Sequence, residues 1–383
     1  MKKTLLLLPG PVPVAVPVLE AMAHPMIDHR GPEFAEMLGR LGEGMQPIFG
    51  TSQDVLFLGS SGTGALEAAV VNLFSPGDVV LSCPLGIFGK RLAAIAAAYG
   101  CIVETLEVPL GCGVDVAALA ARLRDESGRT IRGVLLTHNE TSTGVQCDMA
   151  AISRAIADHG ALSVVDSVSG LGASEFKMDE WGFDVVVTAS QKALAVPPGL
   201  AMVAVSERAW KAIEGARIPR FYFDLVKARE FSRKGQTAWT PPISIFFALA
   251  VALERYHAGG MRAQFERHAR YARAIRGAFR ALAFSIFSRD GAHSDTVVAA
   301  VPPTGIDAAA LLRTLRETYG VVLSGGQGEL AGKIVRFGTM GDIQEFDILA
   351  AVGTLELALS EAGSPVNFGS GISAAAHELR GGH

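Results

Sequence analysis

The chain has 383 residues, of which 49% are hydrophobic and 19% are charged, and its formal net charge is −4. This length and composition are typical of a compact protein with a large core, divided into two domains. No long run of lysine or arginine points to a nucleic-acid partner. No apolar stretch approaches the roughly 20 residues of a membrane-spanning helix.

The first twenty residues have some features of a secretory signal, because Lys2 and Lys3 precede an apolar stretch from Leu5 to Leu8. Four prolines between residues 9 and 17 would break the apolar helix that such a signal needs. We therefore predict an extended segment over residues 1–20 that belongs to the folded protein.

The cysteines and histidines indicate reduced thiols and no metal site. None of the four cysteines belongs to a CxxC pair, so we expect free thiols in a cytoplasmic protein. The nine histidines form no HExxH motif, and none lies at ligand spacing from a cysteine, so no metal is expected.

Between residues 55 and 205, apolar strands alternate with helices, which is typical of a sheet covered by helices on both faces. The predicted helices of this part include 63–74 and 86–99. The predicted strands are 55–58, 79–82, 102–107, 131–137, 162–166, 184–188 and 200–205. They are rich in Val, Ile and Leu throughout, as in buried parallel strands. The sequence thus predicts an α/β fold with a large domain over residues 21–258 and a mainly parallel seven-stranded sheet.

After residue 240 the pattern changes to two long helices, near 243–258 and 261–282, followed by shorter elements. These are a strand (296–301), a helix (307–319), a strand (334–337) and a helix (343–362). They predict a smaller α+β domain over residues 259–362. The tail over residues 363–383 is rich in Gly, Ser and Ala, so we predict that it is flexible.

Ligands of an open α/β sheet bind beyond the carboxyl ends of its strands, so polar residues at those ends are the candidate site. The segment Gly59–Gly64 lies between a predicted strand and a helix. Its glycines and the helix N-terminus suit a phosphate group. It lacks the third glycine of the dinucleotide fingerprint. Taken alone, the segment fits a plain tight turn equally well.

Two charged residues end neighbouring strands. Asp166 by itself fits a helix cap, a metal ligand or a partner for a cationic ring nitrogen. Lys192 follows the next strand, and lysine is rarely placed in apolar surroundings without a function. A phosphate site, a carboxylate and a lysine together match the needs of pyridoxal phosphate (PLP). The lysine forms a Schiff base, the carboxylate keeps the ring nitrogen protonated, and the phosphate is anchored.

With these residues, the sequence resembles the class V aminotransferases of fold type I, and within them the alanine/serine–glyoxylate aminotransferase group. The resemblance covers nearly the whole chain. Its carriers are the segments 8–11, 28–34, 59–67, 86–91, 137–144, 166–169, 190–194, 197–199 and 332–338.

The resemblance implies a role for each matching position. Lys192 and Asp166 would be catalytic. Ser61, Gly62 and Thr63 would hold the phosphate. Gln191 would assist them, and Thr240 would reach over from a second subunit of a homodimer. Phe88 would stack on the cofactor ring, Val168 would pack under it, and Thr141 would bond to its hydroxyl. Arg336 would bind the substrate carboxylate, and His29 would also contact the substrate.

Other interpretations of three positions stay open: Phe88 as a core residue, Thr141 as a turn cap and Arg336 as part of a structural ion pair. One position departs from the family. Some relatives have a phosphate-binding tyrosine three residues before Thr240, whereas this chain has Thr237. That leaves a hydroxyl of shorter reach.

The implied reaction is ping-pong transamination between an amino acid, such as alanine or serine, and a small 2-oxo acid, such as glyoxylate or pyruvate. Aspartate, ureidoglycine and 2-aminoethylphosphonate are alternative donors, and a non-catalytic subunit is an alternative of another class. A cysteine desulfurase is disfavoured because Gln191 stands where such relatives have His and no cysteine lies in a C-terminal active loop.

Overall fold

The structure is a computed structural model that describes residues 4–125, 128 and 130–381. Residues 1–3 of the predicted N-terminal segment and 382–383 of the predicted tail lie outside this part. The helices are α1 (Val16–Ala21), α2 (Pro32–Phe49), α3 (Gly62–Leu73), α4 (Ile87–Ala98), α5 (Val116–Arg124), α6 (Met149–Ile156), α7 (Met178–Trp181), α8 (Glu207–Ile213), α9 (Leu225–Ser232), α10 (Ile243–Ala258), α11 (Met261–Ala281), α12 (Ala308–Glu317), α13 (Glu345–Glu361) and α14 (Ser370–Leu379).

The strands are β1 (Leu5–Leu6), β2 (Val55–Leu58), β3 (Val79–Ser82), β4 (Ile102–Thr105), β5 (Ile131–Thr137), β6 (Asn139–Glu140), β7 (Val145–Gln146), β8 (Leu162–Asp166), β9 (Val185–Ala189), β10 (Ala201–Val205), β11 (Ser285–Ile286), β12 (Val297–Val301), β13 (Val321–Val322), β14 (Ser324–Gly325) and β15 (Val335–Gly338). No helix in the described ranges is long and apolar enough to cross a membrane.

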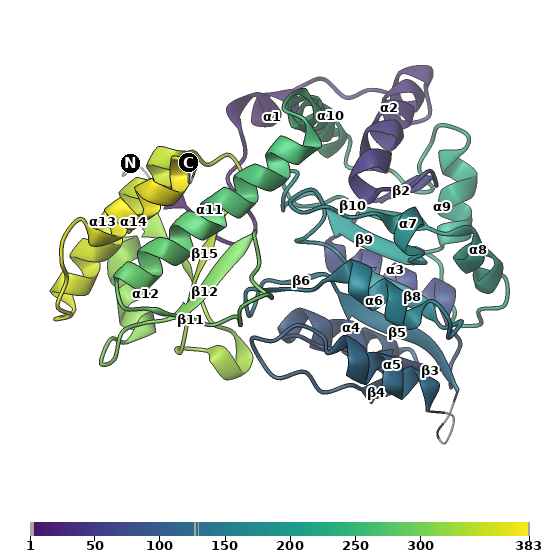
Figure 1. Cartoon of the computed structure of the whole chain (residues 1–383). Helices are drawn as coiled ribbons and strands as arrows, with labels where there is room; N and C mark the ends of the chain where they lie inside the picture. The colour runs from purple at the N-terminus through teal and green to yellow at the C-terminus, as the bar shows by residue number, and fades with distance from the viewer. Residues whose placement is uncertain (1–3, 126–127, 129, 382–383) are drawn as a thin grey trace.

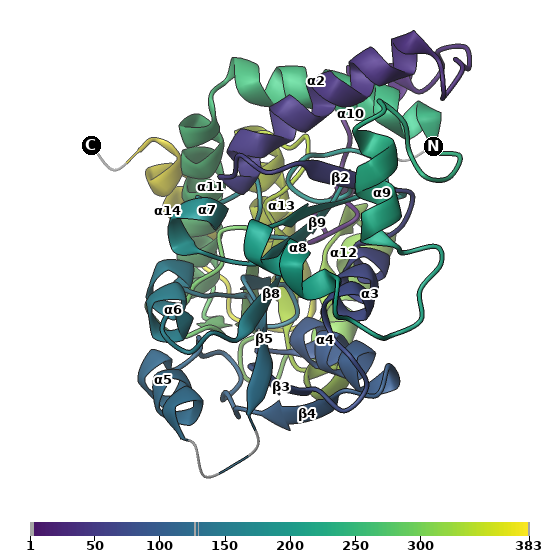
Figure 2. The same cartoon turned by 90° about the vertical axis from the view of Figure 1, so that its right-hand side faces the viewer.

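Seven strands form the large sheet, in the order β2-β10-β9-β8-β5-β3-β4. Strand β10 is antiparallel to both of its neighbours, and the other neighbouring pairs are parallel. Helices α5, α6 and α7 lie on one face, and α3 and α4 lie on the other (Figure 2). Every residue of β8, β9 and β10 is buried, which explains their largely apolar sequences. The predicted α/β class and mainly parallel seven-stranded sheet are confirmed.

A second part of the chain packs beside the large sheet (Figure 1). Its antiparallel sheet has the order β11-β12-β15-β14, and α11, α12, α13 and α14 share one apolar core with it. The N-terminal strand β1 pairs with β13 of this part before the chain continues to the large sheet. The proposed domain boundary after residue 258 falls between α10, in the large core, and α11, in the second core.

The prediction of an extended segment over residues 1–20 is wrong from Val16 onward, where α1 begins. Pro17 lies in the first turn of this helix, where a proline removes no helical hydrogen bond. Ala15 and Val18 are buried in the large core, and α1 packs against α10.

The prediction of a flexible tail is also wrong for residues 370–379, which form α14 on the surface of α11. A glycine of the tail lets α14 approach its neighbours closely, since a Cβ at Gly371 would lie 2.9 Å from Cδ1 of Leu282 and 3.0 Å from Oε1 of Glu356. Ala375 and Leu379 are buried in the second core. Small residues here indicate close packing, not mobility.

Replacing Leu379 by alanine should therefore lower the free energy of unfolding by about 2–5 kcal/mol, because it leaves a cavity under α14. Urea unfolding of the variant and of the wild type measures this difference. Phe368→Ala is the control, since Phe368 is 58% exposed and should cost far less. Equal stability of the Leu379 variant and the wild type would mean that α14 does not pack on the core.

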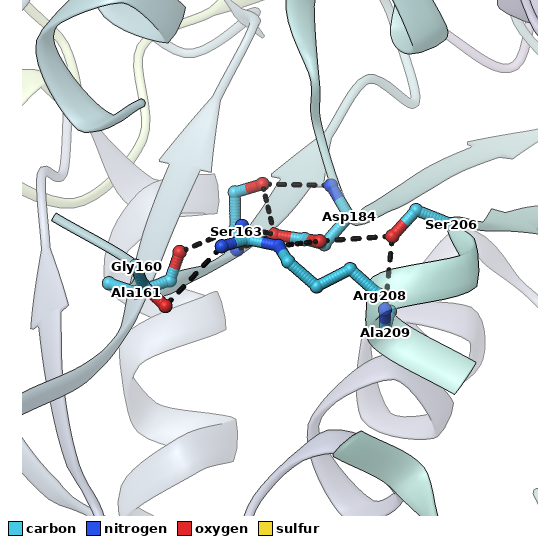
Figure 3. Close-up of polar contacts among 7 residues, drawn as sticks. All are labelled: Gly160, Ala161, Ser163, Asp184, Ser206, Arg208 and Ala209. Carbon is cyan, nitrogen blue, oxygen red and sulfur yellow. Dashed lines mark hydrogen bonds and ion pairs between the residues drawn. The ribbon is translucent and has the colours of Figure 1, made fainter. Parts of the chain in front are cut away.

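Asp184 connects the N-terminal ends of β8 and β9 (Figure 3). Its carboxylate accepts hydrogen bonds from the backbone N–H of Ser163 at 2.8 Å and from the Ser206 hydroxyl at 2.9 Å. It also pairs with Arg208, whose guanidinium donates to the carbonyl oxygen of Ala161 at 3.0 Å. The network fixes where the two strands start, and so where Asp166 and Lys192 lie at their other ends.

Candidate active site

A cavity of about 270 Å³ lies among the segments that follow the sheet strands. It contains most of the predicted site residues. Those that line it are Ser61, Gly62, Thr63, Phe88, Thr141, Asp166, Val168, Gln191 and Lys192. They come from five separate segments, so the fold brings together positions up to 131 residues apart in the sequence, from Ser61 to Lys192.

Lys192 lies in the connection between β9 and β10, which several hydrogen bonds hold in place. The backbone N–H of Ser190 donates to the carbonyl oxygen of Leu200 at 2.9 Å, and its hydroxyl donates to that of Pro197 at 2.7 Å. The lysine side chain is 9% exposed. Burial lowers the pKa of Lys192 to about 8, while the nearby charge of Asp166 opposes this shift.

The N-terminal segment closes one side of the cavity against this lysine. Lys192 Nζ donates a hydrogen bond to the carbonyl oxygen of Pro9 at 2.7 Å. Gly10 has φ +128°, and a Cβ there would lie 2.5 Å from Nζ. Only glycine lets the backbone pass so close to the amine.

Asp166 is the last residue of β8 and is 5% exposed. Its Oδ1 accepts the backbone N–H of Val168 at 3.0 Å. Burial raises the pKa of Asp166 to about 6, against the opposing effects of that hydrogen bond and of Lys192. The carboxylate thus lacks a strong cationic partner within the described part of the chain.

The predicted phosphate site is the start of α3, where Ser61 is the N-cap and makes no side-chain capping bond. Ser61, Gly62 and Thr63 line the cavity, so the positive N-terminal end of α3 and the N–H groups of its first turn lie at the cavity wall. A helix N-terminus of this kind is a ready site for an anion.

Arg91 lines the cavity although it is not among the predicted site residues. Its guanidinium lies 4.8 Å from the centre of the Phe88 ring, and its Nη1 donates to the Thr63 hydroxyl at 3.3 Å. The signal that points to it is helical spacing, because residues three apart on α4 share one face.

Arg336 lies beside the cavity, not among the residues that line it, and is 4% exposed. Its Nε donates to the carbonyl oxygen of Gly325 and its Nη1 to that of Thr141, both at 2.8 Å. No ion pair in the described part of the chain includes Arg336, so the interpretation as a structural ion pair has no support.

Thr141 is buried and its hydroxyl bonds to no described residue, so it caps no turn.

Thr240 and His29 lie outside the cavity. Thr240 is exposed, in a loop with Trp239 that borders Gly59 and Tyr222. His29 is half-buried in the turn before α2. The Thr237 hydroxyl donates to the carbonyl oxygen of Trp239 at 2.8 Å, so its hydrogen atom is used in a bond within this loop.

The sequence matches the family "Aminotransferase class-V" over residues 18–337. The chain belongs to this family. The aminotransferase is 41% identical to a protein of Synechococcus sp. named soluble hydrogenase, small subunit, over 98% of both chains. It is 39% identical to the L-aspartate–glyoxylate aminotransferase of Paracoccus denitrificans, over 97% of this chain and 95% of the relative.

Among solved structures, the aminotransferase superposes on pyridoxamine–pyruvate aminotransferase from Mesorhizobium loti with a TM-score of 0.94 and 31% identity. The superposition covers 100% of this chain and 98% of the other. These likenesses confirm the predicted class V family and the fold type I architecture.

The family implies PLP as the cofactor, and the cavity has groups that fit it. Three polar groups there have no hydrogen-bond partner among the described residues: Asp166 Oδ2, Thr141 Oγ1 and Gln191 Oε1. A cationic ring nitrogen would suit the carboxylate, and a ring hydroxyl would suit the threonine. Because Asp166 and Thr141 line the cavity, their unpaired oxygens are available to a ligand there.

Proposed function

We propose that the aminotransferase transfers an amino group from an amino acid, such as alanine or serine, to a small 2-oxo acid, such as glyoxylate or pyruvate, with PLP attached to Lys192. The observation that carries the proposal is the joint presence of Lys192, Asp166 and the N-terminus of α3 in one cavity. PLP supplies an electron sink for the substrate α-carbon when it is bound.

Lys192 then has two tasks, attachment of the cofactor and proton transfer at the substrate α-carbon. A pKa of about 8, which burial causes, leaves part of the released amine neutral near pH 7, so that it can accept a proton. Asp166 stabilises the protonated ring nitrogen. Phe88 and Val168 hold the two ring faces, and Ser61, Gly62, Thr63 and Gln191 bind the phosphate.

Arg336 is proposed to bind the substrate carboxylate. Its Nε and Nη1 are held by backbone carbonyl groups, whereas its Nη2 has no hydrogen bond to a described residue. The fixed guanidinium would thus offer free N–H groups in a set orientation, a geometry that a lysine does not provide. His29 is kept as a second substrate contact.

We further propose a homodimer in which Thr240 serves the partner's phosphate site. Support comes from exposed aromatic side chains beside it: Phe221 is 72% and Tyr222 is 47% exposed, and both rings lie against Trp239. Exposed apolar clusters of this kind are typical of interfaces.

We place the enzyme in the cytoplasm, for which its four unpaired cysteines are the support.

The amino donor is the open part of the proposal. The relative from Paracoccus denitrificans is named for aspartate and glyoxylate, so aspartate belongs in any donor screen. Ureidoglycine and 2-aminoethylphosphonate are weaker alternatives, the latter because it has no α-carboxylate for Arg336. The relative named as a hydrogenase subunit raises the alternative of a non-catalytic role. The intact pair of Lys192 and Asp166 favours catalysis.

The test is to add PLP to the purified protein and record its visible absorbance, then to screen amino donors against glyoxylate and pyruvate. We expect an absorbance band that changes when a donor is added, and a new amino acid formed from the acceptor. A protein that gains no band with PLP contradicts the proposal. If the band forms but no amino group is transferred between any of these pairs, PLP remains the proposed cofactor and the proposed substrates are wrong.

A further inference from the structure

The segment 140–143 follows β5 and lies against the start of α4, although more than fifty residues separate the two in the sequence. Its side chains take up the free N–H groups of that helix. Glu140 Oε2 accepts the backbone N–H of Phe88 at 3.0 Å and that of Gly89 at 3.1 Å. The Ser142 hydroxyl accepts the N–H of Ile87 at 3.1 Å.

The contact requires an unusually close approach of the two segments. A Cβ at Gly86 would lie 2.3 Å from Ser142 Oγ and 2.8 Å from the Glu140 side chain. Glycine is therefore needed at this position for the carboxylate to reach the helix. The Thr143 hydroxyl adds a bond to the carbonyl oxygen of Leu85 at 3.2 Å.

Glu140 is fully buried, and its two carboxyl oxygens accept all four of its hydrogen bonds, an arrangement that suits the ionised form. Its Oε1 accepts the N–H of Ser142 at 3.1 Å and the Ser142 hydroxyl at 2.6 Å, a distance typical of a bond to a charged oxygen. Burial raises the pKa of Glu140, and the four donors oppose this. The positive end of α4 also favours the negative charge.

The start of α4, which the Glu140 carboxylate contacts, carries residues that line the cofactor cavity. Phe88 and Arg91 project from the first turns of α4 into it, and Thr141 follows Glu140 directly. We propose that Glu140 is a positioning residue, whose charged side chain fixes the start of α4 and with it Phe88 against the cofactor. This inference rests on the proposed function, because it assumes that PLP occupies the cavity.

The charge of Glu140 should also affect the charged groups in and beside the cavity. Asp166 at the end of β8, Lys192 after β9 and Arg91 on α4 line the cavity, and Arg336 on β15 lies beside it. Burial is the main cause of the lowered pKa of Lys192, and the charges of Asp166 and Glu140 oppose it. A negative charge here favours the protonated form of the group at Lys192.

The experiment replaces Glu140 by glutamine, which keeps the size and removes the charge. Two quantities are measured on the PLP-loaded protein: the dissociation constant for PLP and the pH midpoint at which the visible band titrates. We expect E140Q to weaken PLP binding by about tenfold or more, as for a lost hydrogen bond to a charged group. We expect the midpoint to fall by up to about one pH unit.

The matched control is E356Q. Glu356 is also buried, and it accepts the N–H groups of Gly369 at 2.7 Å and Gly371 at 2.8 Å at the start of α14, in the second core. A general loss of helix capping would affect both variants alike. E140Q with wild-type affinity for PLP, or with a loss that E356Q shares, overturns the inference.

If E140Q does not fold, S142A replaces it for the PLP dissociation constant alone, because Ser142 donates to Glu140 and accepts from Ile87 while the charge of Glu140 is kept. Failure of the proposed function is distinguishable from failure of the inference. Wild-type protein that gains no band with PLP contradicts the cofactor and both proposals. Wild-type protein that gains the band, with E140Q behaving like E356Q, contradicts the role of Glu140 alone.

Discussion

Replacing Lys192 by alanine is expected to abolish transamination and to leave the fold intact. Proton transfer by a positioned side chain alone contributes about 10²–10⁴-fold to rate, and the variant loses the covalent attachment of the cofactor as well. The stability of the cofactor-free protein should change little, because removal of a buried amine whose charged form is disfavoured offsets the lost hydrogen bond to the carbonyl oxygen of Pro9. Steady-state assays, visible absorbance and urea unfolding measure the three effects.

The control is Lys211→Ala, on the exposed surface of α8. This variant should keep the activity, the absorbance band and the stability of the wild type. A Lys192 variant that still turns over at more than about a hundredth of the wild-type rate would place the proton transfer on another group.

The centre of the site follows from the sequence because local patterns determine it. Parallel strands that are buried on both faces show as unbroken apolar runs, and their carboxyl ends meet at one edge. Asp166 and the residues after β9 can therefore be assigned to one site from the sequence alone. The start of α3 can be added because a glycine-rich turn before a helix is a local signal.

Contacts between distant segments cannot be predicted in the same way. The bond from Lys192 to the carbonyl oxygen of Pro9 depends on β1 pairing with β13, which no local pattern signals. The sequence of α14 predicts a flexible tail because glycine and alanine are common both in mobile segments and in close helix contacts. Burial against α11 decides between the two.

The interactions of Glu140 show the same limit within the site. Its position in the 137–144 segment indicates that it is part of the site. The sequence does not show in which direction its side chain points. Only the folded chain shows that it bonds to α4 and not to the cofactor side of the cavity. Thr240 is a different case, because its proposed partner is the phosphate site of a second subunit.

Asp166→Asn is expected to stabilise the cofactor-free protein while weakening the binding of PLP. Burial raises the pKa of Asp166 from 3.8 to about 6 in the folded protein, so the unfolded chain loses this proton at lower pH. The folded state is therefore penalised as pH rises from about 4 to 6, by up to about 3 kcal/mol at pH 7. Asparagine removes this penalty, and its side-chain oxygen can still accept the N–H of Val168.

The sign of the effect should reverse when PLP is bound. A protonated ring nitrogen gives Asp166 its missing partner, so the wild type gains more from the ligand than the variant does. Urea unfolding at pH 7 and pH 4, with and without PLP, tests this pattern. The variant should be more stable than the wild type only without PLP and only at the higher pH.

Asp184→Asn provides a control of opposite sign in the same sheet. Asp184 is as buried as Asp166, but Arg208, Ser163 and Ser206 satisfy its carboxylate (Figure 3). Its replacement should lower stability by about 1–3 kcal/mol, because donors lose their acceptor. If Asp166→Asn also destabilises the cofactor-free protein at pH 7, then Asp166 supports the fold itself and is not held in reserve for a cationic ligand.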